Sequence, residues 1–154
     1  MLTVEERQEI EAKLPDYPNK QAICIDAMLA IQARRGWVSD ESLRDISELL
    51  GLSTADLDGV ATFYNLIHRR PVGRHVALLC DSVSCWIMGS DRVRDHLCAS
   101  LQTALGGTTP DGRFTLLPIV CLGACDRAPA MMIDGDLHED LDERRAEELL
   151  KGYA

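Results

Sequence analysis

The sequence predicts an α+β fold, in which an amino-terminal helical bundle is followed by an α/β domain with a small mixed sheet. Apolar residues recur at helical spacing through the first half, whereas the second half has two short apolar runs with a helical stretch between them. The basic run His68–Arg74 is broken by proline and glycine, which is typical of a linker. We therefore expect a helical bundle over residues 1–70 and an α/β domain over residues 71–154.

Composition excludes several classes of partner. The chain has 154 residues, of which 46% are apolar, enough for a real core. No uninterrupted apolar run approaches the ~20 residues that span a bilayer, so direct membrane insertion is not expected. The 16 basic and 25 acidic residues give a net charge of -9, which repels phosphate backbones, so nucleic acid is not an expected partner. The four cations of the linker could touch an acidic partner or simply form a solvated turn.

The first two helices are expected from their end signals. Thr3 and Glu6 have the spacing of a capping box, and the helix they begin should stop at Leu14, since the residue before a proline avoids helical geometry. Asn19 is expected to cap a longer helix that ends at Gly36. Apolar residues lie nearly all round this second helix, which predicts a position inside the bundle.

Two further helices complete the first half. Ser39 should cap a helix that presents apolar residues on one face and is closed by Gly51. Ser53 should begin the last one. Its apolar stripe consists of Leu57, Val60, Ala61 and Tyr64. Such a stripe is usually core, so we expect no cofactor contact from the helical half.

The second half changes its period. His75–Leu79 is an apolar run typical of a buried strand, and Phe114–Ile119 predicts a second strand. A helix is expected between them, over about Asp91–Leu105, closed by the glycine pair that follows. A right-handed crossover makes the two strands parallel, which brings their carboxyl ends to one edge of the sheet.

The remaining elements are a hairpin and a terminal helix. Ala130–Ile133 followed by the Asp134–Asp136 turn predicts the hairpin, and apolar residues from Ala146 to Tyr153 predict an amphipathic helix. A small mixed sheet flanked by helices is thioredoxin-like in outline.

Two close cysteine pairs follow the two parallel strands. Cys80 comes at the end of the first strand, and Cys85 lies in the loop that follows it. Cys121 and Cys125 follow the second strand. Four thiolates at one edge of a sheet suit a [2Fe-2S] cluster, in which each iron takes two thiolates. The other two cysteines, at positions 24 and 98, are interpreted as core residues.

Other uses of the four cysteines fit less well. Structural zinc usually takes a C-x2-C knuckle, although wider knuckles occur, and the gaps here are four and three residues. Disulfides need an oxidising compartment, whereas the acidic start Met1–Glu6 lacks a basic and apolar leader and predicts a cytoplasmic chain. A thioredoxin-type dithiol needs C-x-x-C, which the sequence lacks. Rieske-type ligation needs histidines inside the loops, but those at 68, 75, 96 and 138 lie outside them.

Long stretches of the chain resemble the NuoE family, the small [2Fe-2S] subunit of the NADH-oxidising module of bacterial respiratory complex I. The stretches that carry the resemblance are Thr62–Asn65, Cys80–Trp86, Asp111–Pro118 and Cys121–Ile133. The resemblance implies that Cys80, Cys85, Cys121 and Cys125 ligate one cluster, with no catalytic residue in this chain. It also implies an oxidoreductase subunit of the cytoplasmic, peripheral part of the assembled complex.

The same resemblance places FMN and the NADH site on a larger NuoF-type partner. This agrees with the lack of a G-x-G-x-x-G fingerprint or a P-loop in the sequence. The cluster would accept one electron from reduced flavin and return it. Related small subunits occur in NAD-dependent formate dehydrogenases and bidirectional hydrogenases, which the cysteine spacing does not separate from complex I. A zinc-stabilised adaptor and a free ferredoxin-like shuttle remain alternatives.

Residues beside the cysteines could tune a cluster. Ser82 and Ser84, with the N–H groups near Gly123 and Ala124, could donate hydrogen bonds to sulfur and raise the reduction potential. The serines could equally only shape the turn. The carboxylates at positions 81 and 126 each adjoin a candidate ligand and would lower the potential.

Overall fold

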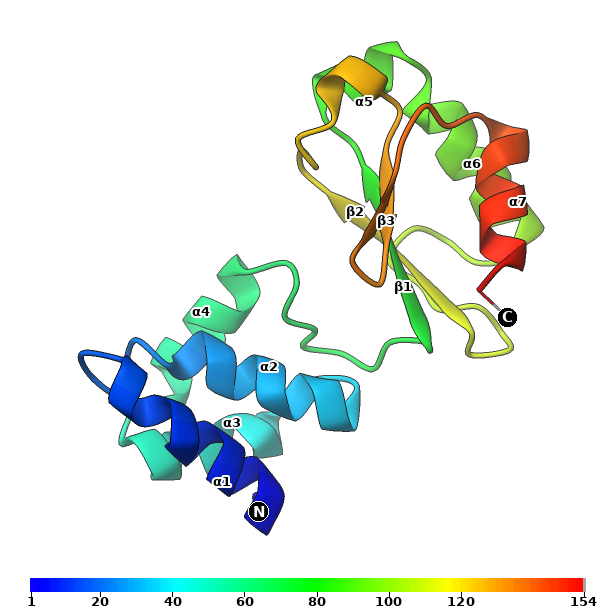
Figure 1. Ribbon diagram of the computed structural model, residues 1–154. Helices are drawn as coiled ribbons and strands as arrows, with labels where there is room; N and C mark the ends of the chain where they lie inside the picture. The colour runs from blue at the N-terminus through cyan, green and yellow to red at the C-terminus, as the bar shows by residue number, and fades with distance from the viewer. Residues whose placement is uncertain (154) are drawn as a thin grey trace. The chain divides into compact units, whose positions relative to one another are not determined.

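A computed structural model describes residues 1–153 as two compact units, of which the first spans Met1–Pro71 and the second begins at Val72 (Figure 1). Each unit encloses a hydrophobic core of its own. Within residues 1–153, none of the helices is both long enough and apolar enough to cross a bilayer. The architecture confirms the predicted α+β class, with helices first and a mixed sheet second.

The first unit contains only helices. They are α1 (Val4–Lys13), the 3-10 turn η1 (Leu14–Asp16), α2 (Cys24–Arg35), α3 (Asp40–Leu50) and α4 (Thr54–Phe63). The predicted capping box is confirmed, because Glu6 N–H donates to Thr3 Oγ1 at 3.2 Å and Thr3 N–H donates to Glu6 Oε2 at 2.8 Å. Ser39 and Ser53 cap α3 and α4 as predicted, each accepting a backbone N–H three residues on.

The prediction for α2 was wrong at its start. The helix begins at Cys24 rather than at Asn19, although it ends at Gly36 as expected. The Asn19 side chain accepts a hydrogen bond from Ala22 N–H at 2.9 Å and closes a separate turn, a local bond that competes with helix formation. Leu29 is exposed, so α2 is not buried all round.

The predicted stripe of α4 is core only in part. Leu57 and Ala61 are buried, whereas Tyr64 lies beyond the helix end and is exposed. The reason is that Tyr64 leaves the helical conformation and takes an extended one as the C-cap residue.

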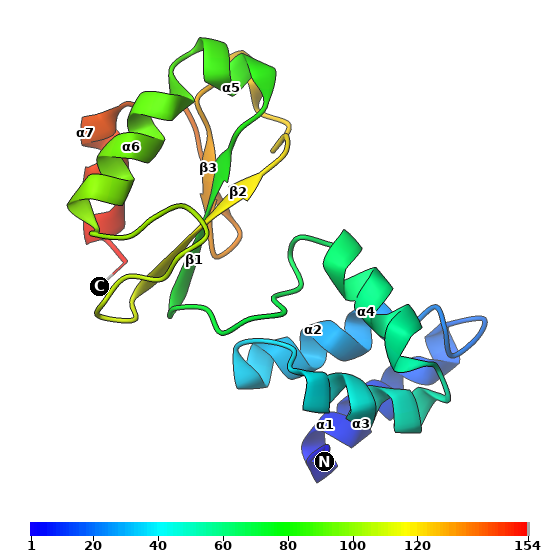
Figure 2. The ribbon, with the colours of Figure 1, turned by 180° about the vertical axis from the view of Figure 1, so that it is seen from behind.

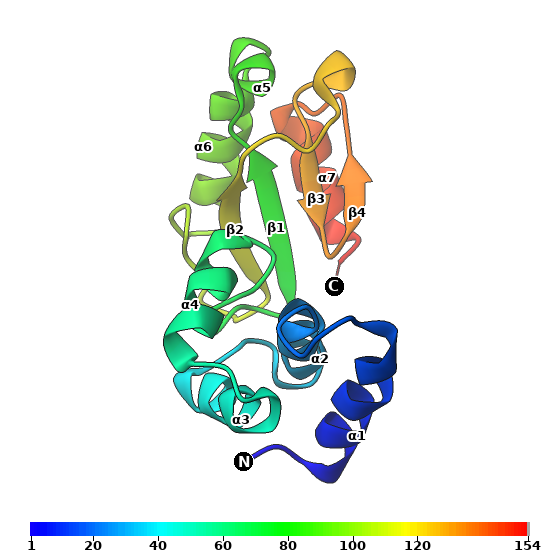
Figure 3. The same ribbon diagram turned by 90° about the vertical axis from the view of Figure 1, so that its left-hand side faces the viewer.

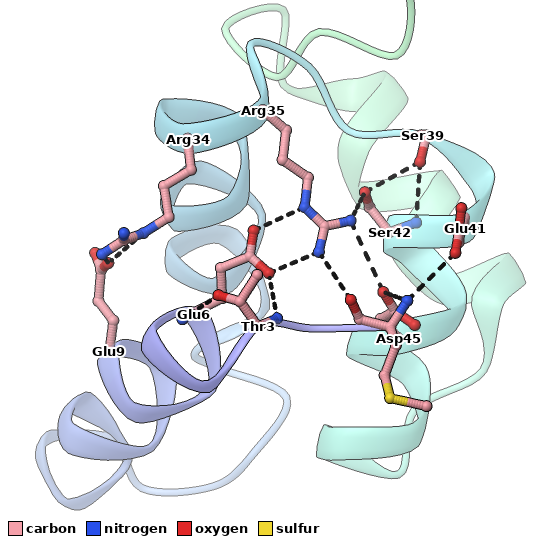
Figure 4. Close-up of polar contacts among 10 residues, drawn as sticks. Thr3, Glu6, Glu9, Arg34, Arg35, Ser39, Glu41, Ser42 and Asp45 are labelled. Atoms are coloured by element: carbon pink, nitrogen blue, oxygen red, sulfur yellow. Dashed lines mark hydrogen bonds and ion pairs between the residues drawn. The ribbon is translucent and has the colours of Figure 1, made fainter.

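A buried ion pair joins three helices of the first unit (Figure 4). Arg35 donates from Nε to Glu6 Oε1 at 2.7 Å and from Nη2 to Glu6 Oε2 at 2.6 Å, and the Glu6 side chain is only 2% exposed. Arg35 Nη1 also donates to Ser42 Oγ at 3.2 Å. The hydrogen bonds offset the cost of removing the Glu6 carboxylate and part of the Arg35 guanidinium from water, so α1, α2 and α3 are tied together by one cation.

The basic run between the units is partly used within the first unit. Arg69 donates to Asp58 Oδ1 at 2.8 Å and to Asp40 Oδ1 at 2.6 Å, and also to the carbonyl of Val38. The suggestion that all four cations could meet a partner was therefore wrong for Arg69, because its guanidinium is already paired. Arg70 and Arg74 are exposed.

The second unit is built on four strands in the order β2-β1-β3-β4. The strands are β1 (His75–Cys80), β2 (Phe114–Ile119), β3 (Met131–Ile133) and β4 (Asp136–His138). As predicted, β1 and β2 are parallel, while β3 pairs antiparallel with both β1 and β4. Asp134 and Gly135 have φ of 50° and 99°, as a two-residue hairpin turn requires.

Two long helices cover one face of this sheet (Figure 2). They are α6 (Ser90–Ser100) and α7 (Glu143–Lys151), and the predicted terminal helix is thereby confirmed. The core between helices and sheet is formed by Ala77, Leu79, Val93, Leu97, Phe114, Leu116, Met131, Ile133, Leu141, Ala146 and Leu150. These residues hold β1 and β2 in the position that aligns their carboxyl ends.

The predicted extent of α6 was wrong. The helix ends at Ser100 instead of reaching Leu105, because Gln102 has a φ of 52° and leaves the helical path. Gly106 N–H donates to the carbonyl of Leu116 in β2 at 2.6 Å, and Leu116 N–H donates to the carbonyl of the next glycine at 3.0 Å. The segment thus provides hydrogen-bond partners for backbone groups of β2 at the edge of the sheet. These tertiary hydrogen bonds replace the last helical turn that was expected.

Candidate metal centre

The two cysteine loops lie at the same end of the sheet, where β1 ends (Figure 3). Cys80 is the last residue of β1, and Cys121 is the second residue after β2. The loops are tied to the strand ends, because Asp81 N–H donates to Ile119 O at 3.0 Å and Cys80 N–H donates to Ala130 O at 3.2 Å. Parallel pairing of β1 and β2 therefore decides the location of both cysteine pairs.

Cys85 lies in a short helix that the sequence did not predict. This helix, α5, spans Val83–Ile87, where an irregular loop was expected. Its N-cap residue is Ser82, whose carbonyl accepts a hydrogen bond from Trp86 N–H at 2.9 Å. The serine before the helix was a visible signal, but five residues are too few for apolar periodicity to show.

The second cysteine loop is anchored to the chain that leads into α7. Cys125 begins the 3-10 turn η2 (Cys125–Arg127). Arg127 forms ion pairs with Asp140 at 2.7 Å and Glu139 at 3.1 Å. The backbone supports this arrangement, because Asp140 N–H donates to Arg127 O at 2.8 Å. These contacts hold the loop without using the thiols.

The two cysteine pairs differ in exposure. Cys80 and Cys85 are only 3% and 2% exposed, whereas Cys121 and Cys125 are exposed. The buried thiols pack among three small residues, Ala124, Ala128 and Ala130. The Sγ atoms of Cys121 and Cys125 lie 3.3 Å apart. One pair is thus shielded by the protein, while the other is at the surface.

The charge state of the thiols follows the same division. Burial raises the pKa of Cys85 to about 11, and the adjacent Cys80 thiol contributes to that rise. In the exposed pair, the Gly123 N–H group lowers the pKa of Cys121, since it donates to that sulfur at 3.3 Å. The hydrogen bond with Cys121 raises the pKa of Cys125, while the Ser84 hydroxyl opposes that rise.

The donor set fits a binuclear iron–sulfur cluster. Such a cluster needs two pairs of thiolates, and bound iron deprotonates thiols that burial keeps neutral. Cys80 and Cys85 pack in one cluster with Ala124, the residue that precedes Cys125. Within the described part of the chain, no three His, Cys, Asp or Glu side chains converge tightly enough to hold a single metal ion. The arrangement is one of two adjacent pairs.

Residues outside the loops are placed as expected. Cys24 is buried in the helical core, and Cys98 is a half-buried residue of α6. The histidines make other contacts, such as His96 with Glu147 at 3.1 Å. Asp81 and Asp126, which adjoin candidate ligands, are exposed to solvent.

An apolar rim on the two cysteine loops was missed in the sequence. We use this name for five exposed side chains on the two loops, namely Val83, Trp86, Ile87, Met88 and Val120. Trp86 and Ile87 are 59% and 70% exposed, and Val120 is 71% exposed. The signal was present as consecutive apolar residues after Cys85, which would be unfavourable on a free surface.

A small mixed sheet with two cysteine pairs at the carboxyl ends of its parallel strands defines a thioredoxin-like protein with a thiol-rich edge. The comparisons agree: the family model described as "Thioredoxin-like [2Fe-2S] ferredoxin" matches residues 10–154. The chain belongs to the thioredoxin-like [2Fe-2S] ferredoxin family and, within it, to the NuoE family of NADH-quinone oxidoreductase subunits. The resemblance seen in the sequence is thereby confirmed.

Relatives support this membership over nearly the whole chain. The E subunit of NADH-quinone oxidoreductase from Pseudomonas aeruginosa is 46% identical over 153 residues, covering 99% of this chain and 92% of the relative. The Escherichia coli K12 protein of the same name is 46% identical over 152 residues, with the same coverage. The crystal structure of an air-oxidised NAD+-reducing [NiFe]-hydrogenase matches with a TM-score of 0.70 and 26% identity. That match covers 82% of this chain but 22% of the hydrogenase chain.

Proposed function

We propose that this chain is the electron-transfer subunit of a respiratory NADH:quinone oxidoreductase, and that Cys80, Cys85, Cys121 and Cys125 hold one [2Fe-2S] cluster. The cluster exchanges one electron with FMN on a larger NuoF-type subunit, which also binds NADH. The helical bundle (residues 1–70) and the ferredoxin domain (residues 71–154) divide the chain, and only the second carries the redox site. No residue of the chain is catalytic in this proposal.

The observation that carries the proposal is the position of the four thiols. Two loops from parallel strands bring two cysteine pairs to one end of a thioredoxin-like sheet. The family is named for the same cofactor type, and the near full-length relatives are named for the same complex. Structure and relatives therefore support one interpretation from independent directions.

When bound, the cluster supplies a site that gains and loses a single electron. The chain's own residues control the access of water and of an electron donor to that site. Cys80 and Cys85, with the small alanines around them, exclude water from one side. Cys121 and Cys125 leave the other side open, which is the side an electron donor can approach.

The apolar rim supports the proposal of a protein partner at this open side. Its five side chains are exposed on the same two loops as the cysteines, and an exposed apolar patch of this kind marks an interaction site. A flavoprotein that covers the rim would remove it from water and shorten the path between flavin and cluster. The whole assembly would then be peripheral to the cytoplasmic face of the membrane, held there by other subunits.

A second candidate has a specific observation in its favour. The structural match to an NAD+-reducing hydrogenase favours the small [2Fe-2S] unit of such an enzyme, or of an NAD-dependent formate dehydrogenase. The higher identity to the NADH-quinone oxidoreductase subunits favours complex I. Identification of the proteins that co-purify with the tagged chain distinguishes the two.

The proposal is tested by expression with and without the candidate flavoprotein subunit. Purified protein should contain two irons and two acid-labile sulfides per chain, and dithionite should produce a rhombic electron paramagnetic resonance signal. Zinc in place of iron would support the adaptor alternative instead. A colourless polypeptide after anaerobic reconstitution would overturn the proposal.

A further inference from the structure

Three large apolar side chains are exposed where α4 ends. Phe63, the last residue of the helix, is 80% exposed, and Tyr64 and Leu66 are 45% and 50% exposed. The rings of Phe63 and Tyr64 pack edge to face, with their centroids 5.2 Å apart. We call these three residues the α4 patch. A cluster of this kind marks an interaction site, because it is unfavourable in contact with water.

The fold itself exposes the α4 patch, because the backbone of this segment is fixed. Ile67 is buried, and its N–H group donates to the carbonyl of Tyr64 at 2.9 Å. The side-chain amide of Gln32 in α2 binds the residues on either side of Ile67. It donates to the Leu66 carbonyl at 2.8 Å and accepts from His68 N–H at 2.6 Å. The exposed side chains thus belong to an anchored turn rather than to a frayed helix end.

An exposed glycine lies on the same helical face as the α4 patch. Gly59 precedes Phe63 by one helical turn, and glycine in a helix interior weakens the helix. Nothing in the described residues 1–153 requires a glycine here. A Cβ atom at this position would meet no atom within 4 Å beyond its chain neighbours and its own helix backbone. A bare stretch of helix beside a large ring lets another molecule approach the backbone closely.

The charge around the α4 patch selects the kind of partner. The chain has 25 acidic residues, yet none lies between Thr62 and Arg74, a stretch that contains three arginines. Arg69 is paired within the helical unit. Arg70 is exposed, and no carboxylate of residues 1–153 forms an ion pair with it. A second copy of this chain, with a net charge of -9, is disfavoured by repulsion. The complementary surface is apolar and carries a carboxylate that can face Arg70.

We propose that the α4 patch, with Gly59 and Arg70, docks the NuoF-type flavoprotein subunit through an apolar surface that bears a carboxylate. The inference rests on the proposed function, which already requires a stably bound flavoprotein that can keep the patch covered. It gives the helical unit, which holds none of the four candidate ligands, the role of binding the partner. This contact is additional to the apolar rim of the sheet unit.

The test measures the affinity of the full-length chain for the purified flavoprotein subunit by surface plasmon resonance. Phe63→Ser should weaken binding about tenfold or more, because a buried aromatic anchor is lost. Val4→Ser is the matched control, since Val4 is 66% exposed on α1 of the same unit, and it should keep the wild-type affinity. Arg70→Gln should make binding less sensitive to salt, because it removes a charge pair from the interface. Wild-type affinity in Phe63→Ser overturns the inference.

Gly59→Ala gives two readouts of opposite sign. Alanine is the better helix former and has open space here, so the midpoint of denaturant unfolding should rise. Affinity for the flavoprotein should nevertheless fall about tenfold, because the added methyl group clashes with a closely packed partner. A damaged fold cannot explain weaker binding by a more stable variant. Unchanged affinity in Gly59→Ala overturns the inference. A flavoprotein that does not bind even the wild-type chain instead refutes the proposed function, so the two failures are distinguishable.

Discussion

The two units of this chain solve the problem of burying polar groups in opposite ways. The helical unit encloses the Glu6–Arg35 pair and satisfies it with hydrogen bonds, so its charges serve the fold. The sheet unit leaves two thiols and five apolar side chains exposed at one end. In the first unit the buried Glu6 carboxylate has its hydrogen-bond partners inside the fold, whereas in the second unit the thiols of Cys121 and Cys125 remain exposed.

The difference teaches where stability and function are located in the chain. A side chain that already has its partners contributes to folding and has little left for a ligand. Exposed thiols with an apolar rim are unfavourable for the isolated fold and gain from being covered. Substitutions in the two units should therefore have separable effects.

The largest expected effect is loss of the cluster in Cys85→Ser. A serine oxygen is a poor substitute for a thiolate on iron, so the rhombic signal after dithionite should vanish or change greatly. Cys98→Ser is the matched control, since Cys98 is half-buried in the same unit but away from both loops. An unchanged spectrum in Cys85→Ser would show that the cluster is held elsewhere.

Glu6→Gln should destabilise the helical unit. Breaking a buried pair leaves Arg35 with only the more distant Asp45, 3.8 Å away, as a counter-ion. We expect the free energy of unfolding of the helical unit to fall by about 3 kcal/mol. Denaturant titration followed by circular dichroism measures the change, and the cluster spectrum should be retained. Glu9→Gln removes only the half-exposed pair with Arg34, so it should cost less than about 1 kcal/mol. Equal losses in both variants would contradict the comparison.

The same pair predicts a dependence on pH. The hydrogen bond from Arg35 is the main cause that lowers the pKa of Glu6 below its usual 4.5. A carboxyl whose folded pKa is depressed stabilises the fold above its unfolded pKa and loses that contribution as pH falls through the folded value. Wild type should therefore lose stability below about pH 4.5 faster than Glu6→Gln. Parallel pH profiles of unfolding for the two proteins would exclude this role.

Ile87→Asp tests whether the apolar rim of the sheet unit binds the flavoprotein partner. A charge placed in the apolar rim should weaken binding to the flavoprotein partner about tenfold or more, because the carboxylate must be desolvated in the interface. Val4→Asp, at a similarly exposed apolar position in the helical unit, is the control. Surface plasmon resonance measures both affinities, and an unaltered affinity for Ile87→Asp would place the partner on another face.

The smallest expected effect is that of a helix cap. Ser39 Oγ accepts Ser42 N–H at 3.1 Å, and Ser39→Ala should lower the free energy of unfolding of the helical unit by about 1 kcal/mol. Denaturant titration detects this change. A loss as large as that of Glu6→Gln would mean that caps, rather than the buried ion pair, hold the bundle together.

Much of the fold was predictable because its signals are local. The Thr3 capping box, the Ser39 cap and the hairpin turn at Asp134 each depend on residues within four positions of one another. The parallel pairing of β1 and β2 followed from the crossover rule, which needs only the order of the elements. The position of the two cysteine loops at one edge followed from that pairing.

Two of the errors arise where distant residues compete with local preference. The helix α6 stops at Ser100 because the segment around Gly106 pairs with β2, a choice that depends on a strand not yet reached in the chain. Arg69 looks like a free cation in the sequence, yet Asp40 and Asp58 pair with it from other helices.

The sequence by itself determined the number and spacing of the thiols, the class of fold and the family, because each of these is carried by residue type and order. Only the tertiary structure decided that Cys80 and Cys85 are buried while Cys121 and Cys125 are exposed. The reason is physical: burial and hydrogen bonding depend on how the two loops pack against each other, and that packing brings together residues about forty positions apart.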